Sequence, residues 1–502
     1  MAKHGLGSLS VASSLMVMIY ALGSVSGGHF NPAVSIGLAL AECAGHGGFE
    51  VGLAALYTGA QLLGGLAGGI SSAALWSSGL GGPSSTLANT TALIEAGDVA
   101  HPAVPLGSPG NAYGFGCVFC AEAIYTALLV FVVLNVATCG DEKKEKNYYF
   151  AFAIGLVIVA GASAVGPISG CSLNPAVSLG VASSGALFAE GVPASGMALQ
   201  FLLYSGAEIA GAIVAFALFI CCRRHLLEDD EPEPAMVSKL LSEFLGTYVL
   251  VLTVCLVVVQ ASKAPLAGVV GIAASLMVMI YALGAVSGGN FNPAVSLGLL
   301  LTGNLPFMEF GLYVISQVIG GCAAVGTAAL MYQHKWPVAL VADVPPGSHV
   351  EAAAGQGSWG AICGAELFYT FVLVLVVLNV AIRDAPNQYY GLAIGFVIIA
   401  GGCAVGGLSG GCFNPAVALS LDFGGIFGDG KEKYGSGLVY AAAELVGAAV
   451  AAGVFLGVSQ TEEEDEEYAY SRPSTEMEEE GNTNMDLDDL PSSRVPLAGR
   501  QG

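Results

Sequence analysis

Four asparagines in this chain stand in nearly the same surroundings, each followed by proline and alanine. The four segments read SGGHFNPAVS at 26–35, SGCSLNPAVS at 169–178, SGGNFNPAVS at 287–296 and SGGCFNPAVA at 409–418. Asparagine is a favoured helix N-cap, and proline suits the first helical position because its missing N–H has no partner there. Each motif therefore predicts the start of a helix. The motif residues are Asn31, Pro32, Ala33, Asn174, Pro175, Ala176, Asn292, Pro293, Ala294, Asn414, Pro415 and Ala416.

An asparagine amide at a helix N-terminus can donate hydrogen bonds to neutral oxygen-bearing molecules. The helix end itself carries roughly half a positive charge from the macrodipole. The apolar run after each motif is about ten residues, or roughly 15 Å, which reaches half of a bilayer. Two such ends facing each other would repel cations, hydronium included, and would favour a pore for uncharged molecules. The asparagines could also serve merely as caps, a role that is compatible with lining a pore.

The composition indicates the class of protein that holds these motifs. Hydrophobic residues make up 55% of the chain, charged residues 11%, and the mean hydropathy is +0.72. Runs such as 240–259 and 371–382 carry few or no charges, which is typical of membrane-spanning helices. Closely spaced glycines at 64–69 and 320–326 would let such helices approach closely. We therefore predict an all-α polytopic membrane protein in the lipid bilayer.

The net charge of −23 is concentrated in the C-terminal tail. Thirteen of the 38 acidic residues follow Gln460, in a segment with few aliphatic residues, which predicts disorder. This tail could be a solubilising segment or a site of trafficking or regulation. The 12 cysteines show no metal-like spacing and are expected to fill space in the core. We expect no metal, no cofactor and no nucleic-acid partner.

Comparison of the chain with itself shows two levels of repetition. The decapeptide SLMVMIYALG occurs at 14–23 and again, unchanged, at 275–284. Each long repeat carries two motifs, which predicts an inverted repeat with half-helices meeting at the midplane. The second repeat predicts six spans and the first only five, and we expect this to reflect an incomplete gene model. The expected segments are a truncated domain at 1–222, a linker at 223–238, a complete domain at 239–458 and a disordered tail at 459–502.

Basic residues give weak support for placing the linker and the tail in the cytoplasm. That orientation puts seven Lys or Arg residues inside, including Lys239 and Arg383, against five outside. It also places outside the sequon Asn89-Thr-Thr, a candidate glycosylation site that could equally be a chance match. The choice between the plasma membrane and an internal membrane stays open.

Paired Asn-Pro-Ala half-helices in an inverted repeat resemble the aquaporins and aquaglyceroporins, the major intrinsic proteins. The similarity extends to the segments EFLGT at 243–247, AIGLVIVAG at 153–161 and AIGFVIIAG at 393–401. It implies two tandem barrels, with five and six transmembrane helices and four half-helices. It also implies buried structural acids at Glu122, Glu243 and Glu366, of which Glu243 would brace the loop carrying a first motif. Members of the family form tetramers, which implies a homo-oligomer with a tetramer-like set of pores.

The resemblance also implies where the selectivity filter lies, and there this chain departs from the water-selective pattern. The usual arginine is replaced by valine, and the histidine and aromatic positions are small or aliphatic. A filter of this kind would be wide and hydrophobic. The filter positions are Val11, Ala162, Cys171 and Val177 in the first repeat and Ile272, Gly402, Gly411 and Val417 in the second.

We therefore expect a passive channel for small uncharged solutes, such as glycerol, urea or other polyols and amides, and for water. One alternative is a secondary active transporter, which would need intramembrane charges for ion coupling. Another is a partly non-conducting protein in which only the second repeat is active. No Ser/His/Asp set, phosphate loop or metal cluster favours an enzyme.

Overall fold

The computed structural model describes residues 7–46, 48–77, 113–138, 148–188, 194–223, 233–258, 265–331, 358–382, 388–425 and 435–471. All regular structure in these ranges is helical. We call the helices of residues 7–222 repeat one and those from residue 236 onward repeat two. Repeat one contains α1 (Gly7–Ser26), α2 (Pro32–Cys43), α3 (Val51–Ser77), α6 (Phe115–Ala137), α7 (Phe150–Ser169), α8 (Pro175–Phe188) and α9 (Ala194–Cys222). Repeat two contains α10 (Met236–Val258), α11 (Pro265–Ser287), α12 (Pro293–Leu301), α13 (Phe307–Met331), α14 (Trp359–Ala381), α15 (Tyr390–Ser409), α16 (Pro415–Gly424) and α17 (Ser436–Ser471).

Eleven helices in the described part of the chain are long and apolar enough to cross a membrane. They correspond to the expected five and six spans, and the chain is a multi-pass integral membrane protein. The remaining four helices, α2, α8, α12 and α16, each begin at the proline of a motif. Asn292 shows why, because its backbone is extended and its side chain accepts a hydrogen bond from Ala294 N.

Small residues bring the short helices against the long ones. A Cβ atom on Gly65 of α3 would lie only 2.1 Å from the carbonyl oxygen of Ala176 in α8, so no larger residue fits there. The reciprocal contact is made by Gly180, whose Cβ would lie 2.4 Å from the carbonyl oxygen of Gly65. The glycine run at 64–69 therefore positions the second half-helix of repeat one.

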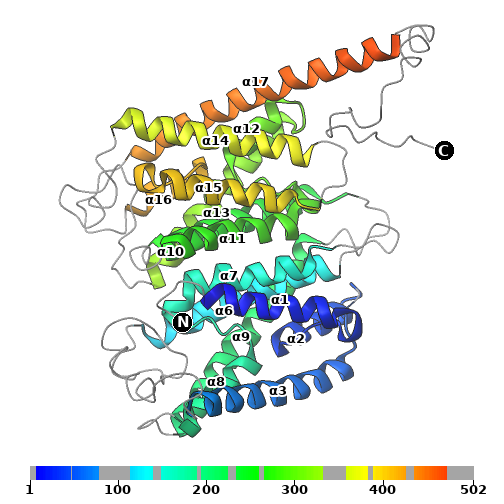
Figure 1. The fold of residues 1–502 in the computed structure, drawn as a ribbon, viewed down its shortest axis with the longest axis vertical. Coiled ribbons are helices and arrows are strands. Elements are labelled where there is room, and N and C mark those ends of the chain that lie inside the picture. The colour runs from blue at the N-terminus through cyan, green and yellow to red at the C-terminus, as the bar shows by residue number, and fades with distance from the viewer. Residues whose placement is uncertain are drawn as a thin grey trace, which may run out of the picture. The chain divides into compact units, whose positions relative to one another are not determined.

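Helices of the two repeats pack against each other within the compact unit formed by residues 1–452. Helix α11 of repeat two contacts α7 and α6 of repeat one, and α10 contacts α7 and α9 (Figure 1). Tyr149 stacks on Tyr281 across this boundary, with ring centroids 4.4 Å apart. Ser163 Oγ donates to Ala267 O at 3.1 Å.

Two expected boundaries differ from the structure. Arg223, assigned to a cytoplasmic linker, is buried, and its guanidinium donates to Asn135 Oδ1 and to Ala282 O, both at 2.9 Å. These acceptors offset the cost of burying the charge.

The C-terminal tail is expected to be disordered from residue 459, but helix α17 continues to Ser471. Glutamate and alanine are good helix formers, and extending an existing helix is easy compared with starting one. Residues 453–502 form a second unit.

Candidate functional site

The four motif asparagines cross-link the two half-helices of each repeat. In repeat two, Asn292 Nδ2 donates to Phe413 O and Asn414 Nδ2 donates to Phe291 O, both at 2.9 Å. Each Oδ1 meanwhile accepts from the alanine N–H two residues on. A side-chain amide has two N–H donors, so one donor on each asparagine remains for a molecule between the helix ends. Capping and donation are therefore combined in one side chain.

Repeat one has the same arrangement. Asn31 Nδ2 donates to Leu173 O at 2.8 Å, and Asn174 Nδ2 donates to Phe30 O at 2.9 Å. The structure thus pairs motifs that lie more than 120 residues apart in each repeat.

The residue before each motif asparagine adopts a left-handed backbone. Phe30, Leu173, Phe291 and Phe413 have φ values of 49° to 52°. This conformation costs a residue with a side chain roughly 1–2 kcal/mol. Each of these carbonyls accepts the amide of the opposite asparagine, and this cross-link helps offset the strain. Sequence analysis missed these positions, because an apolar residue before a cap carries no signal of a positive φ.

Buried glutamates hold the loops that lead into the motifs. Glu243 of α10 accepts from Asn290 N, Phe291 N, Ser287 Oγ and Gln317 Nε2 at 2.6–3.1 Å. Such a carboxylate fixes the loop because leaving any of these donors unpaired would be costly.

The other two expected acids hold the second loops. Glu122 accepts from Ser172 N and Leu173 N, and Glu366 accepts from Cys412 N and Phe413 N. Both are fully buried.

Two further glutamates, absent from the expected site, brace the second motifs themselves. Glu208 accepts from Asn174 N at 3.0 Å, and Glu444 accepts from Asn414 N at 2.9 Å. Their signal in the sequence was the matching segments AEIAG at 207–211 and AELVG at 443–447.

A cavity of about 730 Å³ runs along repeat two between these elements. Its lining extends from Tyr390, the first residue of α15, to Val258, the last residue of α10, and includes Asn292 and Asn414. No charged side chain is among the described residues that line it. The cavity therefore passes both helix ends and presents amide donors in an otherwise mostly apolar wall.

The structure places the expected filter residues of repeat two at this cavity or beside it. Ile272, Gly411 and Val417 line the cavity. Gly402 lies next to Gly411, since a Cβ on Gly411 would be 3.6 Å from Gly402 Cα. In repeat one Val11 and Val177 are exposed, while Ala162 and Cys171 are half-buried.

Two expectations concern other kinds of site. Asn89, the candidate glycosylation site, lies outside the described residues. Among the described residues no group of three or more His, Cys, Asp or Glu side chains could hold a metal ion.

The chain is similar in sequence to known proteins. The profile of the major intrinsic protein family matches residues 4–190, 231–455 and 387–480. Aquaporin NIP1-1 of Zea mays is 32% identical over 226 residues, covering 43% of this chain and 73% of the relative. Aquaporin Z of Photorhabdus laumondii is 36% identical over 175 residues, covering 33% of this chain and 74% of the relative. The crystal structure of the Plasmodium falciparum aquaglyceroporin matches with a TM-score of 0.36 and 20% identity, over 44% of this chain and 96% of that one.

Helices that span a membrane, together with short helices paired by capping asparagines, define a membrane channel protein. The chain belongs to the major intrinsic protein family, as the resemblance of its motifs indicated. This is a family of aquaporin- and aquaglyceroporin-type channels, not of enzymes.

Proposed function

We propose that the chain contains two tandem channel domains, at residues 1–222 and 239–458, and that repeat two is a pore for small uncharged solutes. Glycerol, urea and related polyols or amides are the proposed solutes, with water as a further permeant. The supporting observation is the cavity of about 730 Å³ that passes Asn292 and Asn414 without a charged side chain in its described lining.

The width of the pore is proposed to depend on the filter residues. Water-selective members of the family narrow the outer pore with an arginine, a histidine and an aromatic residue. Val417, Gly402 and Ile272 take these places here. Gly411 lines the cavity together with the aliphatic side chains of Ile272 and Val417, and such an aliphatic wall suits the methylene groups of a polyol.

Exclusion of ions follows from the same geometry. The free amide hydrogens of Asn292 and Asn414 and the two helix N-termini favour oxygen acceptors and disfavour cations. An ion would also lose its hydration in a wall that offers no opposite charge, at a cost of several kcal/mol. Because the family's filter arginine is absent here, the barrier to cations is formed by the electropositive helix ends with their asparagine amides and by the cost of losing hydration.

Flux measurements on reconstituted protein test this function. Proteoliposomes in a stopped-flow instrument are expected to swell in glycerol and urea gradients faster than protein-free vesicles. Solute entry should not respond to a pH gradient or to membrane potential, because coupling to either would indicate a secondary active transporter instead. Potassium or proton conduction comparable to glycerol flux would contradict the proposal.

We propose further that two chains associate so that four domains are grouped together. Within one chain, α6 and α7 of repeat one are covered by α10 and α11 of repeat two. The corresponding helices α14 and α15 of repeat two are much less buried: in an apolar stretch of 18 residues, 39% and 28% of the residues are buried, against 78% and 72% in α6 and α7. In a dimer these helices would contact α1 of the second chain. Mass measurement in detergent or nanodiscs tests this proposal, and a monomeric mass would contradict it.

A further inference from the structure

One helix in each half of each repeat carries a tyrosine followed four residues later by a glutamine or a glutamate. In the halves with the first motif, α3 and α13 read YTGAQ at 57–61 and YVISQ at 313–317. In the halves with the second motif, α9 and α17 read YSGAE at 204–208 and YAAAE at 440–444. A glutamine always has an N–H to donate, whereas a glutamate can donate only when it carries a proton.

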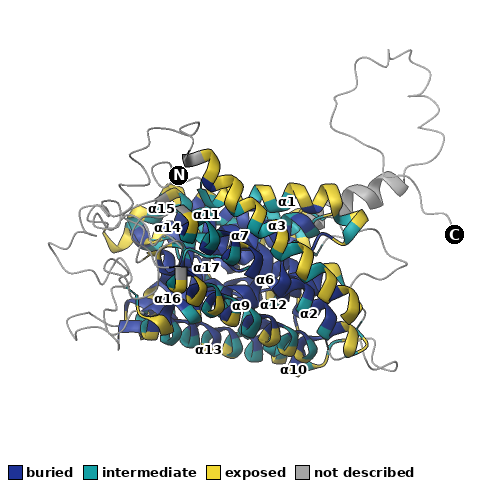
Figure 2. Cartoon of the chain, turned by 90° about the horizontal axis from the view of Figure 1, so that it is seen from below, coloured by how far each residue is buried: buried dark blue, intermediate teal, exposed yellow. Residues whose placement is uncertain are grey.

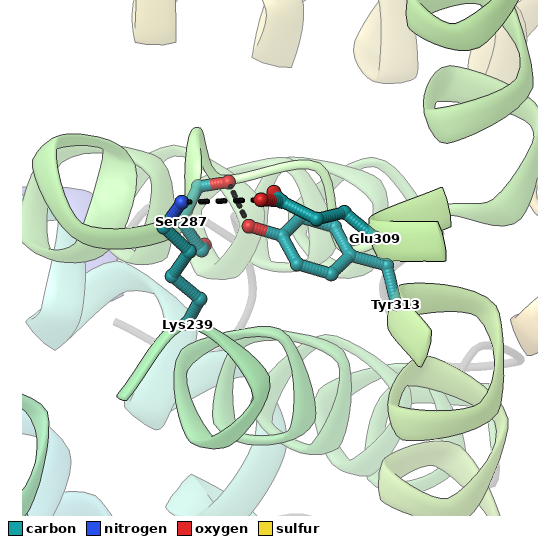
Figure 3. Close-up of polar contacts among 4 residues, drawn as sticks. All are labelled: Lys239, Ser287, Glu309 and Tyr313. Carbon is teal, nitrogen blue, oxygen red and sulfur yellow. Dashed lines mark hydrogen bonds and ion pairs between the residues drawn. The ribbon is translucent and has the colours of Figure 1, made fainter. Parts of the chain in front are cut away.

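The tyrosines show that three of these helices stand in equivalent positions. Each hydroxyl donates to the carbonyl of the serine that begins a motif segment, from Tyr313 to Ser287 at 2.9 Å, from Tyr440 to Ser409 at 2.7 Å and from Tyr204 to Ser169 at 2.6 Å. Figure 3 shows the first of these bonds beside the ion pair of Lys239 and Glu309. The glutamine or glutamate one turn further along each helix therefore reaches the corresponding loop.

At the first motif of repeat two the glutamine is a hydrogen-bond donor. Gln317 Nε2 donates to Glu243 Oε2 at 2.8 Å. Glu243 Oε2 also accepts from Phe291 N, and Glu243 Oε1 accepts from Asn290 N and Ser287 Oγ. Each oxygen of this carboxylate thus has two donors, which is what a buried anion needs.

At the second motif of repeat two a glutamate, Glu444, takes the place of the glutamine. The neighbouring acid Glu366 accepts from Cys412 N on one oxygen and from Phe413 N on the other, at 3.1 and 2.8 Å. Glu444 Oε1 accepts from Asn414 N, but Glu444 Oε2 has no donor among the described residues. The side chains of Glu366 and Glu444 lie within hydrogen-bonding distance of each other. An oxygen without a donor therefore lies beside a second acid.

Repeat one repeats this arrangement with different surrounding residues. Glu208 Oε1 accepts from Asn174 N at 3.0 Å and from Ser178 Oγ at 2.8 Å. Glu208 Oε2 is buried and has no donor among the described residues. The neighbouring acid, Glu122, has a backbone donor on each oxygen. The same oxygen is left over in both repeats.

No positive charge compensates either pair of acids. All four glutamates are fully buried, on helices that have both buried and exposed residues along their length (Figure 2). Among the described residues none of the four forms an ion pair, and no cluster of acids, histidines and cysteines could hold a metal ion. The other titratable groups beside the pairs are uncharged near neutral pH, namely the thiols of Cys412 and Cys171 and the phenols of Tyr440 and Tyr204. Two adjacent buried anions would therefore repel each other at full strength.

We propose that Glu444 and Glu208 each bind a proton at neutral pH, so that the second motif of each repeat contains a proton-binding site between two carboxyl groups. The proton is held on the oxygen that has no donor, and it is donated to the neighbouring glutamate. Glu444 then donates as Gln317 does at the first motif, while its other oxygen accepts from Asn414 N. Asn414 lines the cavity, so the proton removes a second negative charge from the immediate surroundings of the pore.

Infrared difference spectroscopy of the full-length protein tests this proposal. Acids exposed to water are ionised near pH 7, so in an ester-free detergent the carbonyl stretch of a protonated carboxyl reports buried neutral acids. Glu444→Gln and Glu208→Gln should each weaken this band, and the double variant should abolish it. Glutamine has nearly the same shape as a protonated glutamate and keeps both a donor and an acceptor, so these variants are expected to fold.

Two control variants separate these protons from a general effect of losing an acid. Glu309→Gln alters a half-buried ion pair and should leave the band unchanged. Glu243→Gln should leave it unchanged as well, because Glu243 has four donors and is ionised. A bound water that donated to both acids of a pair would leave them ionised and give no band. Absence of the band in the parent protein, or its survival in the double variant, would overturn the proposal.

The pH dependence of stability gives a second measure of the same proton. Unfolding at neutral pH releases the proton, because a glutamate in water is ionised there. The stability of the parent protein should therefore fall relative to that of Glu444→Gln as the pH rises between about 5 and 8, by up to about tenfold in the folding equilibrium per pH unit. Thermal unfolding in detergent measures this difference, and Glu309→Gln should keep the pH dependence of the parent. Parallel pH profiles of the parent and Glu444→Gln would overturn the proposal for repeat two.

Discussion

The hydroxyl of Tyr125 on α6 lies 2.9 Å from the hydroxyl of Thr253 on α10, and this bond joins the two repeats. Thr253 Oγ1 donates its own proton to Val249 O at 2.8 Å, so Tyr125 is the donor between them. Both residues are buried, which places the bond inside the packed boundary between repeats rather than at its edge.

Removal of this hydroxyl is expected to weaken the boundary modestly. Tyr125→Phe should lower the free energy of unfolding by about 1 kcal/mol, a usual value for a hydrogen bond between membrane helices. Thr253→Val should have a similar effect, and the double variant should be no worse than the more destabilised single one. Thermal unfolding in detergent measures all three, and additive effects would show that the two hydroxyls act independently.

Loss of the carboxylate of Glu243 is expected to be more severe. A glutamine there turns an NH₂ group toward two of the four donors, leaving them unpaired at about 1–3 kcal/mol each. Glu243→Gln should therefore lower the unfolding temperature by several degrees. Glu309→Gln is the matched control, since its half-buried ion pair with Lys239 contributes only about 0–1 kcal/mol. Equal stability of the two variants would contradict the bracing role of Glu243.

The motif asparagines provide a test of which repeat conducts. Aspartate at Asn292 and Asn414 keeps an oxygen for the alanine N–H but removes the donor to the opposite carbonyl. Glycerol flux should fall at least about tenfold, because an unpaired carbonyl or a buried charge costs more than 1.4 kcal/mol. The same change at Asn31 and Asn174 should have a smaller effect. Stopped-flow swelling measures both, and full flux in the first variant would show that repeat one conducts alone.

Mercurials are expected to act on repeat two through Cys412, which lines its cavity. In repeat one, Ser172 aligns with Cys412, and the preceding residue, Cys171, aligns with Gly411. Cys412→Ser should therefore remove inhibition of glycerol flux, whereas Cys171→Ser should matter only for flux through repeat one. Cys403→Ser is the control, because Cys403 is exposed and is not among the described residues that line the cavity. Inhibition that survives Cys412→Ser would place the reactive thiol elsewhere.

Local sequence rules predicted the helices well and their bonding poorly. The expected five and six spans are present among the described residues, because long apolar runs leave few other options in a membrane. The four short helices follow from asparagine and proline at their starts. The backbone at Phe291 and the burial of Arg223 could not be predicted, since both depend on partners far away in the sequence.

The filter positions came from resemblance rather than from local pattern. Ile272 and Val417 read as ordinary helix residues, and only the alignment of the motifs singled them out. The structure brings them to one cavity through helices that are widely separated along the chain.

Helix α10 lines the cavity of repeat two with one side and contacts α7 and α9 of repeat one with another. A single helix thus separates the cavity of repeat two from the helices of repeat one. If the two repeats were expressed as separate proteins, the side of α10 that contacts α7 and α9 would become exposed. Each separate repeat would then need another apolar partner to cover this surface.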